Sequence, residues 1–380
     1  MGNGLWCDDT RYTALALESF GAQIRHSSEA IEIIGTGGDL SCPAEAIYLE
    51  NAGTSMRLLT AVACLGQGSS ILVGNERMHT RPIEELLVAL QPLGGVVESL
   101  QEKGYPPVRI HGSGLKGGST IVDASRSSQF VSAILLAAPY ASQPVKITVQ
   151  GLVSKPYVDV TLDGMSRFGA RARWLDEKTL RVEAPGPYLA GNYDVEGDCS
   201  SASYFWAAAA ITGGRVSTQN ILRESRQGDL AFLEILCQMG CRAEWHDYGV
   251  TLYGGKLRAI EVDMKDMPDM VPTLAVTAAF AQGKTVITNV SHLRIKESDR
   301  LRAIAEGLEK MNVQVDEKED RLTIIGGNPR GAMITSHHDH RIAMSFAVAG
   351  LMAEGVRIDD EMCVNKSFPQ FWETFEQLYR

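Results

Sequence analysis

The sequence predicts an α/β protein made of two pseudo-threefold domains. Both domains are expected to consist of repeated β-α-β-α-β-β units, the first of them incomplete. Two observations predict this fold: a recurring helix pattern and one Gly/Pro-rich segment that divides the chain. The starts of apolar helices recur roughly 70 residues apart, and self-similarity at a near-constant spacing marks a duplicated structural unit.

Five helices of small, apolar residues are expected, and each follows a polar turn. The turns lie at 51–54, 125–128, 198–201, 266–269 and 338–341. A helix that is apolar nearly all round is buried on every side. We therefore expect these inner helices to pack together within each domain, with their N-termini pointing the same way.

A second, amphipathic type of helix alternates with the first. Its six copies open near Asp8, Arg81, Tyr157, Gly228, Asp299 and Phe368. The copy near Asp299 places Leu301, Ile304 and Leu308 on one stripe, as an outer helix requires. Each copy ends near Gly or Asn, and a strand follows, for example at 94–98 and 169–174. Six outer helices but five inner ones predict that the chain begins inside its first repeat.

The domain boundary is predicted within residues 183–198. This segment holds Pro185, Gly186, Pro187, Gly191 and Gly197, residues that interrupt regular structure. It separates the third repeat from the fourth. We therefore assign repeats one to three to residues 1–194 and repeats four to six to residues 195–380.

Composition excludes several classes of function. The chain is 44% hydrophobic and 22% charged, as ordinary globular proteins are. Its net charge of −10 argues against broad nucleic-acid binding. The start of the chain does not resemble a signal peptide, and the apolar segments are too short to span a bilayer. The seven cysteines contain no C-x-x-C pair. We expect a cytoplasmic protein with free thiols and no nucleic-acid or membrane partner.

Basic residues gather near the expected helix starts. They are Arg57, Arg81, Arg126, Lys155, Lys296, Arg300, Arg341 and Lys366. A helix N-terminus attracts anions through unpaired N–H groups and partial positive charge. Arginine adds planar, bidentate recognition of carboxylate and phosphate. An acidic protein with this pattern is expected to bind a small, multiply anionic ligand. The alternative is that these residues are surface charges and caps.

Three carboxylates accompany these cations. Asp269 follows Pro268 at a helix start, Glu297 lies three residues before Arg300, and Asp339 lies in a histidine-rich run. A carboxylate beside cations can act as a base or shuttle protons. Each also has a simpler interpretation: Asp269 as a cap, or Glu297 as an exposed ion-pair partner. Adjacent residues rarely converge on one metal ion, so we expect no metal site at 337–340. We expect a loop that places Asp339 and Arg341 at a helix start.

Nine segments, in order along the chain, carry a family resemblance: 51–57, 76–83, 123–130, 154–157, 197–202, 268–269, 294–300, 339–344 and 366–369. In these segments the chain resembles the 5-enolpyruvylshikimate-3-phosphate synthase family, from about Asp8 to the C-terminus. The resemblance implies an enolpyruvyl transferase-like fold of two domains that close on substrates. It implies transfer of the enolpyruvyl group of phosphoenolpyruvate to the 5-hydroxyl of shikimate 3-phosphate, in chorismate and aromatic amino-acid biosynthesis. The expected protein is a monomer without a cofactor.

The resemblance also implies roles for individual residues. Asp269 would take the hydroxyl proton, and Glu297 would protonate the enol carbon and later remove a proton. The residues that would hold shikimate 3-phosphate are Ser127, Ser128, Gln129, Ser154, Asp269, His292 and Lys296. Those that would hold phosphoenolpyruvate are Gly53, Arg81, Gln129, Arg300, Arg341 and Lys366.

One feature of the family has no counterpart in this sequence. Family members begin with a segment that holds a Lys-Ser pair and then an arginine, and nothing before Asp8 resembles it. This predicts a truncated N-terminus, with the segment absent or supplied as a separate polypeptide. Smaller departures are Leu58, where proline is frequent, and His292, where some members have asparagine.

Three other functions remain open from the sequence. The chain could be a catalytically impaired member that binds ligand only. It could be the sister enzyme that acts on UDP-N-acetylglucosamine, although that enzyme relies on a loop cysteine, and Ser127, Ser128, Gln129 and the segment 366–369 favour the shikimate type. A repeat-built interaction protein would need no carboxylate between cations.

Overall fold

The computed structural model describes residues 1–379. The chain divides into two compact units, Met1–Val195 and Glu196–Arg380. This division lies one residue from the boundary expected between 194 and 195, at the end of the Gly/Pro-rich segment. Each unit has its own hydrophobic core.

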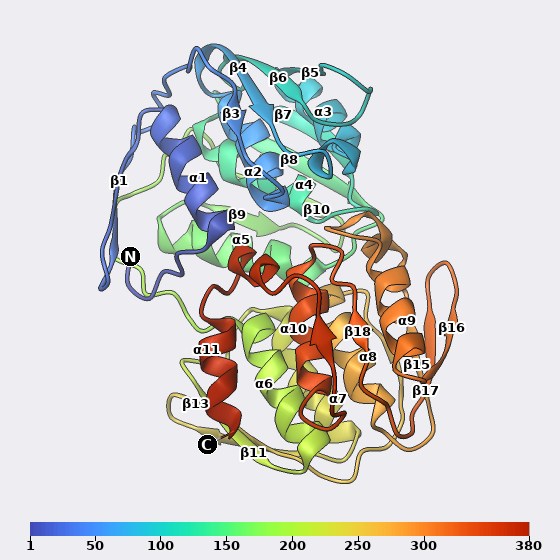
Figure 1. The fold of residues 1–380 in the computed structure, drawn as a ribbon. Coiled ribbons are helices and arrows are strands. Elements are labelled where there is room, and N and C mark those ends of the chain that lie inside the picture. The colour runs from blue at the N-terminus through green and yellow to red at the C-terminus, as the bar shows by residue number, and fades with distance from the viewer. Residues whose placement is uncertain (380) are drawn as a thin grey trace. The chain divides into compact units, whose positions relative to one another are not determined.

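Unit 1 contains five α-helices and ten strands within its described residues (Figure 1). The helices are α1 (Asp8–Ser19), α2 (Gly53–Ala63), α3 (Glu84–Leu90), α4 (Gln129–Ala137) and α5 (Lys155–Arg167). The strands are β1 (Gln23–His26), β2 (Ile31–Ile34), β3 (Ile47–Tyr48), β4 (Gln67–Val73), β5 (Val96–Ser99), β6 (Val108–Ser113), β7 (Gly118–Asp123), β8 (Val145–Gln150), β9 (Ala172–Trp174) and β10 (Thr179–Val182).

Unit 2 follows the same alternation of helices and strands. Its helices are α6 (Cys199–Thr212), α7 (Phe232–Gln238), α8 (Val271–Ala279), α9 (Arg300–Lys310), α10 (His340–Ala349) and α11 (Phe371–Glu376). Its strands are β11 (Arg215–Gln219), β12 (Arg242–His246), β13 (Gly249–Tyr253), β14 (Glu261–Asp263), β15 (Lys284–Thr288), β16 (Gln314–Glu317), β17 (Leu322–Ile325), β18 (Met333–Ile334) and β19 (Arg357–Ile358).

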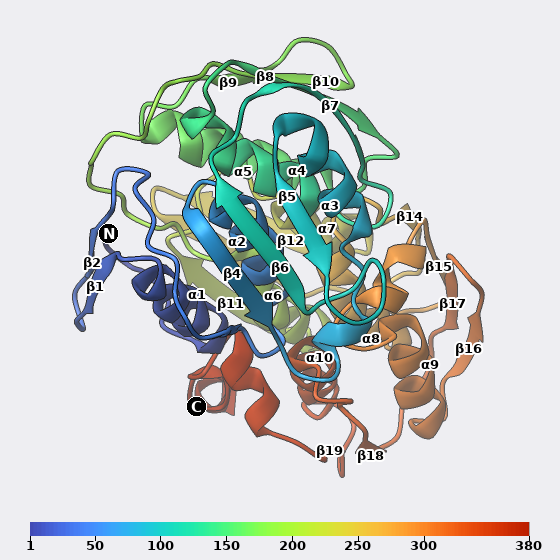
Figure 2. The ribbon, with the colours of Figure 1, turned by 90° about the horizontal axis from the view of Figure 1, so that it is seen from above.

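The sheets confirm the expected β-α-β-α-β-β repeat. Three four-stranded sheets share one strand order: β3-β4-β6-β5, β7-β8-β10-β9 and β14-β15-β17-β16. In each, the first two strands are parallel and joined by an inner helix, and the last two form an antiparallel hairpin. Figure 2 shows β4, β6 and β5 side by side in the first of these sheets.

The inner helices are buried as their sequences predict. Every residue of α8 is buried, and so are nearly all residues of α6. The helices α6, α8 and α10 pack on one another in unit 2, and α2 packs on α4 in unit 1 (Figure 1). The outer helix α9 instead buries one face, with Leu301, Ile304 and Leu308 in the core. Packing of parallel inner helices aligns their N-termini, and this alignment places the site described below.

The units differ in their number of inner helices. Within residues 1–379, unit 2 has three (α6, α8 and α10), whereas unit 1 has two (α2 and α4). The opening part of unit 1 contributes α1 and the separate hairpin β1–β2. The first repeat of this chain therefore contains an outer helix and a hairpin, as the uneven helix count predicts.

Two further expectations concern the whole chain. Among the residues that the structure describes, no helix is both long enough and apolar enough to span a bilayer. The seven cysteines are all free thiols, as their spacing predicts.

Candidate active site

The centre of the site in unit 2 is the buried guanidinium of Arg300, the first residue of α9. Its side chain is 1% exposed. Nη1 lies 2.8 Å from Asp269 Oδ1, and Nη2 lies 2.7 Å from Glu297 Oε2. Nε and Nη2 donate to the two oxygens of Asp339, at 2.8 and 3.2 Å. The sequence-based alternative of an exposed Glu297 ion pair is thus wrong, because both side chains are largely buried.

Asp339 joins this centre to the start of α10. Its carboxylate is fully buried and caps the helix by accepting the backbone N–H of Arg341. It also accepts a hydrogen bond from Ser298 Oγ at 2.9 Å. The expectation that the 337–340 run is a loop placing Asp339 and Arg341 at a helix start is confirmed.

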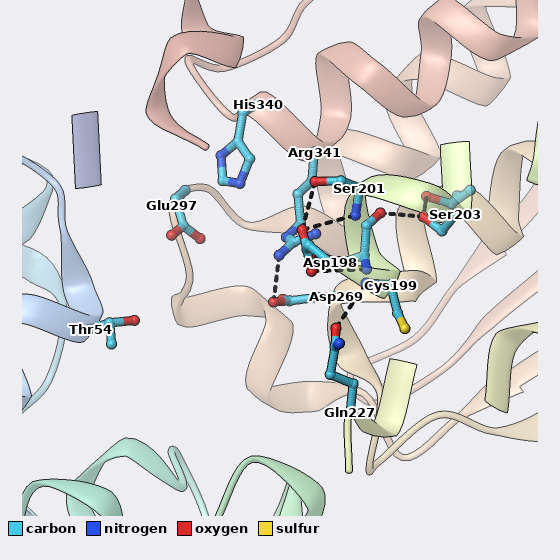
Figure 3. A network of polar contacts seen from close by, with 12 residues as sticks. Thr54, Asp198, Cys199, Ser201, Ser203, Gln227, Asp269, Glu297, His340 and Arg341 are labelled. Carbon is cyan, nitrogen blue, oxygen red and sulfur yellow. Dashed lines mark hydrogen bonds and ion pairs between the residues drawn. The ribbon is translucent and has the colours of Figure 1, made fainter. Parts of the chain in front are cut away.

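Asp269 bridges two arginines rather than capping a helix. It lies in a short 3₁₀ turn, Pro268–Met270, directly before α8. One oxygen pairs with Arg300, and the other lies 2.9 Å from Arg341 Nη2, the pair drawn in Figure 3. Burial by itself would raise the pKa of Asp269, but Arg341, Arg300 and Lys296 outweigh burial and hold the pKa well below its usual range. The site therefore holds Asp269 as a carboxylate.

Two histidines at the site are kept neutral. Burial, with Arg341 and Arg300 nearby, lowers the pKa of His340 to about 3 against the opposing influence of Asp339. Burial and Lys296 lower the pKa of His292 to about 4. Within residues 1–379, neither His292 Nε2 nor His340 Nδ1 has a hydrogen-bond partner. Buried ring nitrogens of this kind are suited to a bound ligand.

The neutral state of His340 predicts how stability depends on pH. Its folded-state pKa lies below the ordinary value of 6.5, so its contribution is complete above pH 6.5 and is lost as pH falls. Between pH 6 and pH 4.5 His340 binds up to one proton more in the unfolded chain than in the folded protein, a contribution of roughly 1.4 kcal/mol per pH unit. We expect His340→Gln to lose this slope in urea unfolding. His338→Gln, which removes an exposed histidine from the same turn, is the control. An unchanged slope in His340→Gln would contradict the assignment.

In unit 1, two buried arginines converge on the start of α2. Arg81 and Arg57 are each 4% exposed. Arg81 Nη1 donates to the carbonyl oxygen and to Oδ1 of Asn51, at 3.0 and 2.9 Å. Arg57 donates to the carbonyl oxygens of Gly53 and Pro82. These carbonyl and amide contacts fix the guanidinium groups beside the N-terminus of α2, where backbone N–H groups also favour an anion.

Gly53 lies between these two guanidinium groups. An ideal Cβ on Gly53 would overlap Arg81 Nη2 and would lie 2.7 Å from Arg57 Nη1. Only a residue without Cβ allows both arginines to approach the first turn of α2 this closely. The structure thus brings the predicted residues Gly53 and Arg81 together.

The starts of α4 and α5 carry the predicted serines of unit 1. Gln129, the first residue of α4, donates from Nε2 to Thr54 Oγ1 at 2.9 Å, which joins the starts of α4 and α2. Its backbone N–H donates to Ser127 Oγ. Ser128 and Ser154 are buried at the N-caps of α4 and α5. Ser154 has a φ of 55°, so the chain turns sharply there before α5.

The remaining predicted cations differ in their surroundings, and Lys296 acts on both Asp269 and His292. Lys296 is close enough to lower the pKa of His292, whereas Lys366 ends a 3₁₀ turn, Met362–Lys366. Arg126 is half-exposed and pairs with Glu85 at 3.3 Å. Lys155 lies next to Ser154 at the start of α5, and its ammonium group pairs with Asp159 at 2.8 Å. Its position at a helix start is therefore not sufficient evidence that it binds a ligand.

The sequence singled out Asp339 but did not reveal its pairing with Arg300, and it did not identify Asn51 or Tyr204 as partners of arginines. Asn51 holds Arg81, and Asp339 holds Arg300. Tyr204 accepts a hydrogen bond of 3.5 Å from Arg341, and burial raises the pKa of Tyr204 to about 12. Each pair joins residues at least 30 positions apart, so no local pattern could reveal it.

The N-terminus of α6 is capped by the side chains of Asp198 and Gln227. Asp198 accepts the backbone N–H groups of Ser200 and Ser201, and Gln227 accepts that of Cys199 (Figure 3). In the part of the chain that the structure describes, no three His, Cys, Asp or Glu side chains are grouped so that they could hold a metal ion.

Comparisons with known proteins agree with this geometry. The family model described as EPSP synthase (3-phosphoshikimate 1-carboxyvinyltransferase) matches residues 1–375. A protein of that enzyme name from Syntrophobacter fumaroxidans is 46% identical over 99% of this chain and 90% of its own length. One from Vibrio cholerae is 42% identical over the whole chain and 90% of its own length. A solved EPSP synthase from Acinetobacter baumannii matches 98% of this chain and 88% of its own, with a TM-score of 0.81 at 31% identity.

These matches bear on the predicted N-terminus and on the family. The family model begins at residue 1 of this chain, so the comparisons do not bear out the prediction of a truncated N-terminus. The matched fold is that of the expected two-domain enolpyruvyl transferases. Because the family model covers nearly the whole chain, and relatives above 40% identity match along it, the protein belongs to the EPSP synthase (3-phosphoshikimate 1-carboxyvinyltransferase) family.

Proposed function

We propose that this chain transfers the enolpyruvyl group of phosphoenolpyruvate to the 5-hydroxyl of shikimate 3-phosphate and releases phosphate. The observation that carries the proposal is the Arg300 centre, where Arg300 and Arg341 both pair with Asp269 directly before α8, and Arg300 also pairs with Glu297 directly before α9. Cations at this density suit a ligand with both phosphate and carboxylate, and the carboxylates supply proton transfer.

The proposed phosphoenolpyruvate residues come from both units. Arg81 with Gly53 and Gln129 belongs to unit 1, and Arg300, Arg341 and Lys366 belong to unit 2. A planar guanidinium can take two oxygens of a carboxylate or phosphate at once. The buried position of Arg81 and Arg300 strengthens each ion pair, because little water competes there.

The proposed shikimate 3-phosphate residues are mostly hydroxyl and amide groups. They are Ser127, Ser128, Gln129 and Ser154 in unit 1, and Asp269, His292 and Lys296 in unit 2. The serines lie at helix starts, where backbone N–H groups favour a phosphate. The buried Nε2 of His292 supports a ligand hydrogen bond at that position.

The proposed chemistry is an addition followed by an elimination. Asp269 takes the proton of the 5-hydroxyl while that oxygen bonds to C2 of phosphoenolpyruvate, and Glu297, in its protonated form, delivers a proton to C3. Glu297 then removes a proton from C3 as the C2–O bond to phosphate breaks, which restores the double bond. The hydroxyl proton finally leaves with the phosphate, so atoms and charges balance. Each proton transfer of this kind contributes about 10²- to 10⁴-fold to the rate.

Substrate binding would also make Asp269 a better base. Arg341 and Arg300 lower the pKa of Asp269, and such a carboxylate attracts a proton only weakly. An anionic substrate competes for the same two guanidinium groups and adds negative charge. Both changes raise the pKa of Asp269 at the step where it must accept a proton.

A phosphate-release assay tests the proposed function. We expect release that requires both phosphoenolpyruvate and shikimate 3-phosphate, and none when UDP-N-acetylglucosamine replaces shikimate 3-phosphate. Asp269→Asn should abolish release while the protein stays folded. No release from folded wild-type protein with both substrates would overturn the proposal, and retained substrate binding in that case would identify a ligand binder without turnover.

Gly53→Ala gives a prediction for phosphoenolpyruvate binding. The new Cβ would overlap Arg81 Nη2 and crowd Arg57, so one guanidinium must move. We expect KM for phosphoenolpyruvate to rise about tenfold or more, as when one charged hydrogen bond is lost. Gly164→Ala, on α5 where a Cβ meets no atom within 4 Å, is the matched control. Equal KM values in the two variants would contradict the proposed role of Gly53.

Two coarser properties complete the proposal. We place the enzyme in the cytoplasm because free cysteines are typical of a reducing compartment. We also propose that it acts as a monomer. Sedimentation equilibrium at micromolar concentration should give a mass near 41.3 kDa, and a dimer mass would exclude this.

A further inference from the structure

We infer that Glu50 is a positioning residue for Arg81, and this inference rests on the proposed function. Glu50 lies between β3 and α2 with a φ of 48°. That left-handed conformation favours glycine, and a glutamate there needs compensating contacts. The carboxylate of Glu50 provides such contacts, and they lead to Arg81 by two routes.

The first route runs through Asn75. Asn75 Nδ2 donates to Glu50 Oε1 at 2.5 Å, and the Asn75 backbone N–H donates to the Glu50 carbonyl oxygen at 3.0 Å. Asn75 Oδ1 in turn accepts the backbone N–H of Met78 at 2.9 Å, at the start of the 3₁₀ turn Met78–Thr80. That turn closes with the backbone N–H of Arg81 donating to the Met78 carbonyl oxygen. Through Asn75, Glu50 thus fixes the backbone of the Met78–Thr80 turn, which positions Arg81.

The second route runs through Asn51. Glu50 Oε2 accepts the backbone N–H of Asn51. Asn51 is 8% exposed and receives Arg81 Nη1 on both its carbonyl oxygen and Oδ1. The second oxygen of the Glu50 carboxylate therefore positions Asn51, the residue that accepts hydrogen bonds from the Arg81 guanidinium.

The segment at Glu50 and the segment at residues 74–78 also pack in direct contact, so neither can shift without moving the other. A Cβ on Gly74 would overlap the Glu50 carbonyl oxygen and would lie 2.5 Å from Met78 Cβ. With the backbones in direct contact, a change in the orientation of residue 50 must move the Met78–Thr80 turn. Glu50 does not touch the anion itself and acts through Arg81.

Two substitutions separate its backbone role from its side-chain role. Glu50→Gly keeps the left-handed backbone without cost but removes both carboxylate contacts. Glu50→Gln has one acceptor oxygen, so it can satisfy Asn75 or Asn51 but not both. We expect KM for phosphoenolpyruvate to rise about tenfold in Glu50→Gly and less in Glu50→Gln. We expect kcat and KM for shikimate 3-phosphate to change by less than about threefold. Glu45→Gln, an exposed site in the same segment, is the control.

A chemical probe tests the same inference without using activity. Phenylglyoxal modifies accessible arginines, and mass spectrometry measures the modified fraction of Arg81. We expect faster modification of Arg81 in Glu50→Gly than in wild type and in Glu45→Gln. Faster modification in a protein that lacks turnover would reject the proposed function and keep the positioning role. Equal modification rates in wild type and Glu50→Gly would overturn the inference.

A double-mutant cycle shows whether Glu50 acts through Arg81. With Arg81→Lys as background, the guanidinium that Asn51 holds is gone, so Glu50→Gly should add no further rise in KM for phosphoenolpyruvate. Fully additive effects would mean that Glu50 influences binding by another route, and would overturn the inference.

Discussion

Glu297→Gln should lower kcat by about 10²- to 10⁴-fold, the contribution of a general acid–base group. Glutamine keeps the size and shape of the side chain but cannot donate and then accept a proton at the enol carbon. Arg300 keeps its contacts with Asp339 and Asp269, so the site should remain assembled. The phosphate-release assay at saturating substrates measures the effect directly.

The control for Glu297 comes from the same helix region. Glu306→Gln makes the same chemical change in a glutamate that pairs with Arg302 Nε at 2.8 Å on the exposed side of α9. Its kcat should stay within about twofold of wild type, because a surface ion pair contributes little. A Glu297→Gln enzyme that retains kcat within threefold of wild type would refute the assigned role of Glu297.

The second large effect concerns stability. Arg300→Met should destabilise unit 2 by about 3–5 kcal/mol at pH 7.5, because it removes one partner of a buried charge cluster. Asp339, Asp269 and Glu297 would then share the site without the guanidinium that contacts all three. Asp339 has the least access to water, since its side chain is fully buried.

The loss of stability in Arg300→Met should depend on pH, because the substitution changes the pKa of Asp339. In the wild type, burial would raise the pKa of Asp339, but Arg300 outweighs it and lowers the pKa. Its contribution is therefore present above the unfolded pKa of about 3.9 and is lost as pH falls further. Without Arg300, burial and Glu297 raise the pKa above the unfolded value, so the folded state gains protons as pH falls. The deficit of Arg300→Met should shrink between pH 7.5 and pH 5.

Urea unfolding at these two pH values measures the deficit. Arg302→Met is the matched control, because Arg302 lies one turn from the site region with a side chain that is 59% exposed. The free energy of unfolding of Arg302→Met should lie within about 1 kcal/mol of wild type at both pH values. A deficit for Arg300→Met that is equal at pH 7.5 and pH 5 would mean that the buried carboxylates do not titrate as described.

The starts of the inner helices could be predicted because their signals are local. Asp198 and Asp339 are N-cap residues directly before apolar helices, and the structure has α6 and α10 begin at the next residue. The strand order of the four-stranded sheets follows from the same periodicity, since a strand, a buried helix and another strand form a parallel pair. Asp269 and Arg341 lie near such starts, whereas Glu297 and Arg300 lie at the start of the outer helix α9.

The partners of the arginines could not be predicted. Arg300 and Asp339 are separated by 39 residues, and Arg81 and Asn51 by 30. A glutamate at position 50 does not indicate a left-handed backbone from sequence. The contacts with Asn75 that stabilise this conformation form only when the two loops pack together. The burial of Glu297 likewise depends on its neighbours in space and not on its neighbours in sequence.

The sequence by itself determined the repeated unit and the starts of the buried inner helices, because helix periodicity and caps act within a few residues. Only the tertiary structure decided which charges are buried together, which ones retain a proton and which are held by Asn51, Glu50 or Asp339. The physical reason is that pKa values and ion-pair strength depend on distance and on exclusion of water. Both quantities exist only after the inner helices have packed.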